Sequence, residues 1–193
     1  MEKIIELVSR GAGEREIQAE FKRNLSAIAK TCVPSAIKDE YIAFSEFPIG
    51  SGSVDFAVFT DRSRMDVVLL EVKGADFGFL NADGTVAKSI SDASGQIRDR
   101  FDFIDKNYQS FRMDAHSIRR RVEGGETIYN SLLGPRGYLN VDPQKDIDVW
   151  GIVIGGRTND DYQESSARHK LERFTYRTRF ESWDSWLRKY GDE

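Results

Sequence analysis

The sequence predicts an α/β (α+β) protein with three layers, in which a mixed sheet lies between two layers of helices. Helix-like and strand-like segments follow one another in the order helix, three strands, helix, strand, helix, strand, helix, which is typical of a sheet covered on both faces. A length of 193 residues with 39% apolar content is sufficient for one well-formed core. We see no internal repeat and no low-complexity tract. We therefore expect a single domain over residues 1–193.

The first half of the chain is expected to form one helix and three strands. Residues 14–30 carry apolar side chains at helical spacing, namely Ile17, Phe21, Leu25 and Ile28. Strands are predicted at residues 40–49, 53–59 and 67–73, because these runs are rich in apolar and β-branched residues and are separated by turn-forming sequence. The second and third strands are joined by a short polar loop.

The second half is expected to alternate helices and strands. A helix is predicted at residues 92–108, a buried strand at 148–154, a polar helix at 160–172, a short strand at 174–177 and a last helix at 181–190. The segment between Arg112 and Gln144 mixes a helical stretch with several glycines. We interpret residues 112–145 as a mobile insertion or a lid.

Composition excludes several classes of protein. The sequence has no apolar run long enough for a membrane span and no secretory signal, so we expect a soluble, cytoplasmic protein without a membrane partner. The single cysteine excludes an internal disulfide and a multi-cysteine zinc site, and two histidines leave little for a histidine-based zinc centre. Any metal would be held by oxygen atoms, which suits Mg²⁺ or Mn²⁺. A formal net charge of −4 argues against a generic DNA-coating protein.

Three charged residues interrupt two strands that otherwise consist largely of apolar residues. Asp55 lies in the second predicted strand, and Glu71 and Lys73 lie two residues apart in the third, so these two side chains should project from the same face. Burial of such charges is costly unless they are paired or bind a metal. The chain has a second Glu-x-Lys triplet, Glu20-Phe21-Lys22, but in a helix its charges do not face each other. The alternative interpretation is an ordinary strand-end ion pair.

This arrangement resembles the PD-(D/E)xK nuclease superfamily, which has a restriction-endonuclease-like three-layer α/β/α core. Members carry an aspartate on one strand and Glu-x-Lys on the next, which Asp55, Glu71 and Lys73 match. Val54 stands where the motif has its proline, a common departure that leaves the ligands intact. The core would cover about residues 14–160, followed by an added C-terminal strand and helix.

Further features resemble the nuclease domain of the Shedu anti-phage defence proteins over about residues 14–190. These features are Gln96 in the helix after the site, the strand end Gly155-Gly156-Arg157, and the strand Phe174-Thr175-Tyr176 before a Trp-containing helix. The resemblance implies a metal-dependent DNA endonuclease acting on phage or other foreign DNA. Shedu proteins often carry an additional N-terminal domain, for which we expect no room in 193 residues. The resemblance therefore supports the chemistry of the site more than the regulation of the protein or its sensing of a target.

The resemblance also implies roles at the site. Asp55, Glu71 and the main-chain carbonyl of Val72 would bind Mg²⁺ or Mn²⁺, which supplies charge stabilisation and an activated water in phosphodiester cleavage. Lys73 would orient or help deprotonate that water, or neutralise the phosphate.

The first helix and the helix after the site could each add a residue. From the first helix we choose Glu16 as the glutamate that completes the site, with Glu20 as the alternative, although both could lie on a solvated helix face. Gln96 could reach the metal or a phosphate, or be an exposed amide.

Basic residues are candidates for contacts with DNA. Arg157 follows a buried strand and could bind phosphate or pair with a nearby acid. Arg119, Arg120 and Arg121 form a cluster that could bind DNA or form a solvated face. We further expect a homo-oligomer and a regulatory partner, by analogy with other nucleases of this fold. Trp183 and Trp186 are interpreted as core or oligomer contacts.

Other functions remain open at this stage. The same fold and chemistry would serve a DNA-repair or junction-resolving nuclease. A third possibility is a module that binds nucleic acid or protein without cutting, and a fourth is a structural protein whose three charges satisfy one another.

Overall fold

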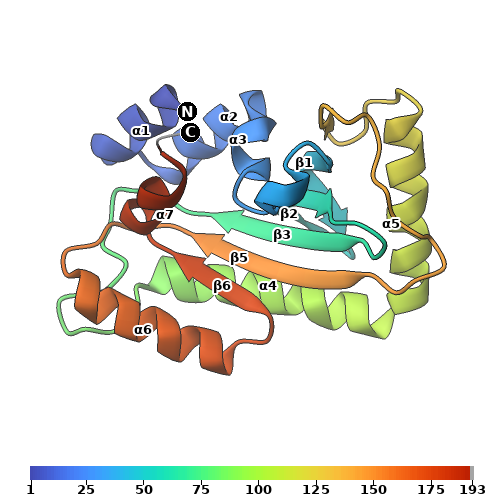
Figure 1. Ribbon diagram of the computed structural model, residues 1–193. Helices are drawn as coiled ribbons and strands as arrows, with labels where there is room; N and C mark the ends of the chain where they lie inside the picture. The colour runs from blue at the N-terminus through green and yellow to red at the C-terminus, as the bar shows by residue number, and fades with distance from the viewer. Residues whose placement is uncertain (192–193) are drawn as a thin grey trace. The chain divides into compact units, whose positions relative to one another are not determined.

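The computed structural model describes residues 1–191, which form an α/β structure with a six-stranded mixed sheet and seven α-helices, as the sequence predicts. The strands are β1 (Tyr41–Ile49), β2 (Gly52–Thr60), β3 (Asp66–Val72), β4 (Leu132–Leu133), β5 (Asp148–Ile154) and β6 (Thr178–Glu181). The helices are α1 (Glu2–Ser9), α2 (Glu14–Arg23), α3 (Leu25–Ala29), α4 (Lys88–Lys106), α5 (Tyr108–Glu123), α6 (Asp161–Phe174) and α7 (Trp183–Tyr190), and a short 3₁₀-helix covers Ser35–Ile37. The order of strands in the sheet is β4-β1-β2-β3-β5-β6. Figure 1 labels each of these strands except β4.

The chain divides into two compact units. We call them the hairpin unit, which comprises Asn24–Leu69 and Asp99–Trp150, and the β6 unit, which comprises Met1–Arg23, Leu70–Arg98 and the chain from Gly151 onward. Strands β3 and β5 and helix α4 each contribute residues to both units. Within residues 1–191, no helix combines the length and the apolar composition needed to cross a membrane.

The hairpin unit is built around β1 and β2. These strands pair antiparallel from Tyr41 opposite Thr60 to Ile49 opposite Gly52, so Gly50 and Ser51 form a two-residue turn. Gly50 has a φ of +64°, a conformation that costs glycine little. Three phenylalanine rings pack together on these strands, with centroids 4.8–5.4 Å apart, at Phe44, Phe47 and Phe59.

The β6 unit contains a parallel strand pair joined by a helix. β5 pairs with β6 in a register that sets Gly151 opposite Thr178 and Ile154 opposite Glu181, and α6 connects the two strands. Asp160 caps α6 by accepting hydrogen bonds from the main-chain N–H groups of Tyr162 and Gln163. Both tryptophans of α7, Trp183 and Trp186, are fully buried, which confirms the interpretation as core residues.

Several predicted boundaries were wrong. The helix predicted over residues 14–30 breaks at Asn24, whose φ and ψ of −133° and 68° are not helical. The strand predicted at residues 174–177 is the end of α6 and a turn, because Phe174 and Tyr176 are exposed and it is Thr178–Glu181 that pairs with β5. Helix α4 begins four residues before the predicted start at residue 92, and β3 ends at Val72. The helical stretch predicted at the start of the segment 112–145 belongs to α5, which begins earlier, at Tyr108.

Asp66, at the start of β3, has an unusual environment in the hairpin unit. Partial burial and the nearby carboxylates of Asp61 and Asp148 raise its pKa to about 6, although the Trp150 side chain donates a hydrogen bond that acts in the opposite direction. A raised pKa in the folded state gives a stabilising contribution that is complete below the ordinary value of 3.8 and is lost as the pH rises through about 6.

We expect Asp66→Asn to stabilise the protein at pH 8 and to have little effect at pH 4. The amide stays neutral at both pH values and keeps an oxygen that can accept the Trp150 hydrogen bond. Thermal unfolding at the two pH values measures the difference in Tm between the variant and the wild type. An equal gain at pH 4 and pH 8 would show that the charge of Asp66 is not the cause.

Candidate active site

The end of β3 carries a buried pair of opposite charges in the β6 unit. Glu71 is 3% exposed and Lys73, directly after the strand, is 8% exposed. The Lys73 Nζ lies 3.6 Å from Glu71 Oε2, so the two side chains meet on one face as the alternation of a strand predicts. Two ions in such a position are tolerated only when each has a partner of opposite charge or further hydrogen bonds.

A second carboxylate contacts Lys73 from helix α2. Glu14 Oε1 lies 3.2 Å from Lys73 Nζ, and the Glu14 side chain remains partly exposed. Glu16, the predicted helix glutamate, instead pairs with Arg10 at 2.5 Å and is 52% exposed. Glu20, the alternative, pairs with Arg23. The glutamate beside Lys73 is therefore Glu14.

Sequence reasoning missed Glu14, although the helix carries a signal for it. Ile17 and Phe21 are fully buried. On a helix, residues separated by three, four or seven positions lie on the same face. Glu14 is three residues before Ile17 and seven before Phe21, whereas Glu16 is turned away from that face.

Gln18, which sequence reasoning also missed, links the helix to the strand. Its Nε2 donates one hydrogen bond to Glu14 Oε1 and another to the main-chain carbonyl of Val72, both at 3.1 Å. The two hydrogen atoms of one amide group thus fix a carboxylate and a carbonyl relative to each other. A continuous polar chain runs from the Val72 carbonyl through Gln18 and Glu14 to Lys73 and on to Glu71.

The main chain at Lys73 is held by Trp183 of α7. The indole Nε1 donates to the carbonyls of Lys73 and Gly74, at 3.0 and 3.2 Å. The Phe21 ring of α2 stacks on the Trp183 ring with centroids 6.1 Å apart. Since the Lys73 N–H also donates to the Ile154 carbonyl at 2.7 Å, the main chain of Lys73 is fixed by both a strand and a helix.

Close packing beside Lys73 requires a glycine at the end of β5. A Cβ placed on Gly155 would lie 2.6 Å from the Lys73 Cβ, a distance that side chains do not tolerate. The next residue, Gly156, has a φ of +70° and donates its N–H to the Gly74 carbonyl. These glycines let two strand ends approach each other at the lysine.

Asp55, the remaining residue of the predicted motif, lies on β2 in the hairpin unit and is half-buried. The β1–β2 register on either side of it places Glu46 opposite. Glu46 is exposed and has a φ of +53°, a left-handed conformation that is uncommon for a residue other than glycine. The β6 unit therefore brings Glu71 and Lys73 together, and Asp55 belongs to the other unit.

Gln96, the predicted residue of the helix after the site, lies at the surface. Gln96 is exposed on α4, and no residue between 1 and 191 forms a side-chain hydrogen bond with it. An exposed amide is one of the two interpretations that the sequence left open.

The four predicted DNA-contacting arginines have different environments. Arg157 forms a bidentate pair with Asp184 at 2.8–3.2 Å and donates to the Val8 carbonyl, which is the pairing alternative. This pair raises the pKa of Arg157, and it lowers the pKa of Asp184 in spite of the opposing effect of burial. Arg119 is buried against Glu123, Arg121 pairs with Glu126 at the surface, and Arg120 is exposed without a partner among the described residues.

The donor atoms in the β6 unit are suited to a hard divalent ion. Glu71 and Glu14 supply carboxylates and Val72 supplies a carbonyl, so all the candidate ligands are oxygen atoms, as Mg²⁺ and Mn²⁺ prefer. The Gln18 bond does not by itself prevent Val72 from binding an ion, because a carbonyl oxygen has two lone pairs. Within residues 1–191, no cluster of three His, Cys, Asp or Glu residues that could hold an ion is found.

A known protein family matches most of the chain. The family model described as "Shedu protein SduA, C-terminal" matches residues 11–187, which include α2, all six strands and most of α7. No curated protein matches the chain.

We expect Trp183→Phe to lower the free energy of unfolding by about 1–3 kcal/mol, because the carbonyls of Lys73 and Gly74 lose a buried donor while an aromatic ring remains beside Phe21. Trp186→Phe is the matched control, since the Trp186 indole is equally buried and its N–H has no partner in the described chain. Urea denaturation of both variants measures the difference. Equal losses would mean that the Trp183 hydrogen bonds contribute nothing.

Proposed function

This chain belongs to the family of the C-terminal region of the Shedu protein SduA, a family with an anti-phage defence context, and we propose that it is a metal-dependent DNA endonuclease. The observation that carries the proposal is the buried contact of Lys73 with Glu71 at the end of β3. A buried ion pair contributes little to stability, so its presence beside a partly exposed carboxylate, Glu14, supports a functional role. The proposed reaction is hydrolysis of phosphodiester bonds in foreign DNA.

Under this proposal Glu71 and the Val72 carbonyl would bind Mg²⁺ or Mn²⁺, and the role of Asp55 as a ligand stays a prediction from the sequence, because Asp55 lies in the hairpin unit. The bound ion would stabilise negative charge on the phosphate and lower the pKa of a water molecule. Oxygen donors at the end of β3 support this assignment, because they match the ligand preference of both ions. Glu14 replaces Glu16 as the proposed glutamate from the first helix, because only Glu14 contacts Lys73.

Lys73 would act on the attacking water or on the phosphate. Its ammonium group carries three hydrogens, and Glu14 and Glu71 each lie within 3.6 Å of it. These contacts set the direction of the ammonium group, which would then orient the water or neutralise the phosphate. Gln18 would act as a positioning residue, because it fixes Glu14 relative to the Val72 carbonyl.

We expect purified protein to cut supercoiled or linear DNA with Mg²⁺ or Mn²⁺ and to be inactive with EDTA, and Lys73→Ala to reduce the rate at least a hundredfold, or about 3 kcal/mol in activation free energy. Lys22→Ala is the matched control, because Lys22 ends the other Glu-x-Lys triplet and lies on a helix. Gel analysis of the products measures the rate. The proposal fails if the wild type cuts no DNA in either metal, and preferential cutting of branched DNA would favour a junction-resolving enzyme.

We expect Glu14→Gln to reduce the cleavage rate about ten- to a hundredfold, because it removes the charge beside Lys73 and changes the position of the ammonium group. Glu16→Gln should change the rate by less than about twofold, since Glu16 contacts only a surface arginine. Initial rates at saturating Mg²⁺ compare the two variants. The opposite order would restore Glu16 as the functional glutamate.

A further inference from the structure

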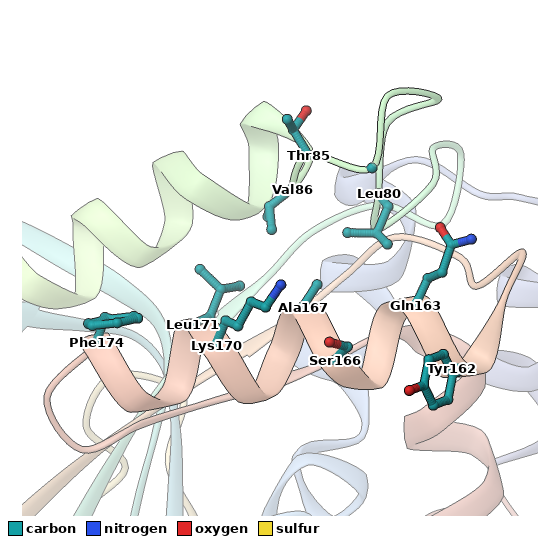
Figure 2. Close-up of a pocket in the computed structure, with 11 residues that line it drawn as sticks. Leu80, Thr85, Val86, Tyr162, Gln163, Ser166, Ala167, Lys170, Leu171 and Phe174 are labelled. Carbon is teal, nitrogen blue, oxygen red and sulfur yellow. The ribbon is translucent and has the colours of Figure 1, made fainter.

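The β6 unit has a hollow of about 550 Å³ between α6 and the turn that precedes α4 (Figure 2). The turn is closed by a bridge between Leu80 and Val86. From α6, Lys170 and Gln163 rise toward this turn, and Phe174 stands near one end of the helix. The apolar part of the lining is supplied mainly by Leu80, Val86, Ala167, Leu171 and Phe174.

Helix α6 is arranged contrary to the usual pattern of a surface helix. The residue that it buries is Glu164, which is 2% exposed and pairs with Arg168 at 2.9 Å. Arg168 also contacts Glu181 of β6 at 3.2 Å, so ion pairs attach the helix to the sheet. The aromatic side chains face outward, since Phe174 is 89% exposed and Tyr162 is 86% exposed, the highest values for large apolar side chains in the described chain.

Exposed apolar surface beside a hollow is typical of interaction sites. The side chains that line the hollow from α6 recur at positions 163, 166, 167, 170, 171 and 174, a spacing that forms one continuous stripe along a helix. From Gln163 to Phe174 this stripe is about 17 Å long, or about three helical turns. These dimensions suit a second helix lying along α6.

The charges at the groove favour an acidic occupant. Lys170 is the charged residue of the lining, and no described residue forms an ion pair or hydrogen bond with it. Arg173 lies outside the lining but next to Phe174 in the chain, is exposed and is likewise unpaired in the described chain. The nearby carboxylate of Glu172 accepts a hydrogen bond from the Phe180 N–H, so it is engaged within the protein.

We propose that the groove between α6 and the Leu80–Val86 turn docks an acidic amphipathic helix of a partner protein. The apolar face of that helix would cover Leu171 and Phe174, and its carboxylates would pair with Lys170 and Arg173. Phe174 and Tyr162 are the aromatic residues of the lining, whereas its walls at Leu80, Val86, Ala167 and Leu171 are aliphatic. Aliphatic walls favour a peptide over single-stranded nucleic acid, because they offer no flat ring on which successive bases could stack. This docking site goes beyond the proposed nuclease activity and does not depend on it.

The test uses two labelled helical peptides about four turns long, with leucines on one face and either glutamates or lysines elsewhere. We expect fluorescence anisotropy to show the acidic peptide binding at least about tenfold more tightly than the basic one. Phe174→Ser should weaken acidic-peptide binding about tenfold or more. Lys170→Glu should remove or reverse the preference between the peptides. Met113→Ser, which changes an exposed apolar residue of α5 in the hairpin unit, is the matched control and should have no effect.

Thermal unfolding checks that each variant is folded, and Tyr162→Ser replaces Phe174→Ser if the latter is destabilised. The proposal is overturned if neither peptide binds, or if binding is the same in all variants. Binding of a single-stranded oligonucleotide that Phe174→Ser abolishes, without peptide binding, would assign the groove to nucleic acid instead. Sedimentation of the wild type as a dimer that Phe174→Ser dissociates would assign it to a second copy of this chain.

Discussion

Desolvation of the Lys73 ammonium and the Glu71 carboxylate at one strand end costs several kcal/mol per ion unless other groups compensate. Much of the β6 unit can be understood as that compensation. Glu14 adds a second negative partner from α2, and Gln18 joins that partner to the strand. The charged pair is therefore stabilised by a neighbouring helix, α2, whose first residue is Glu14.

The main chain at the same position is fixed by different means. Trp183 donates to two successive carbonyls, while Gly155 leaves room for the Lys73 side chain to pass the end of β5. The Phe21 ring stacks on Trp183, so one face of α2 contributes both a charged group at the site and an aromatic ring in the core. Side-chain charge and main-chain position are thus controlled by the same few elements.

Sequence reasoning identified the charged strand end but not its surroundings. The Glu71–Lys73 contact follows from strand alternation, and the control triplet at Glu20 lies in a helix as expected. Glu14 could have been found from the helical phase of Ile17 and Phe21.

The contacts made by Trp183 could not have been found in this way. Trp183 donates hydrogen bonds to main-chain carbonyls 109 and 110 residues away. Because every residue has a main-chain carbonyl, the residue types at these positions do not indicate the contact. The position of β6 was predicted wrongly because residue preference and strand pairing disagree there. The aromatic residues at its expected place, Phe174 and Tyr176, have the intrinsic preference of a strand, but burial and pairing begin only at Thr178.

The dependence of Lys73 on α2 has a consequence for the energetics of the whole site. Single elements of a protein can open by local unfolding, at a lower free energy than global unfolding. If α2 leaves β3, Glu14 and Gln18 depart together, and both Lys73 and the Val72 carbonyl lose contacts in a single step. The fraction of molecules with an assembled site is then set by the opening equilibrium of ten residues, Glu14–Arg23, and any ligand that binds only the docked helix raises that fraction by mass action.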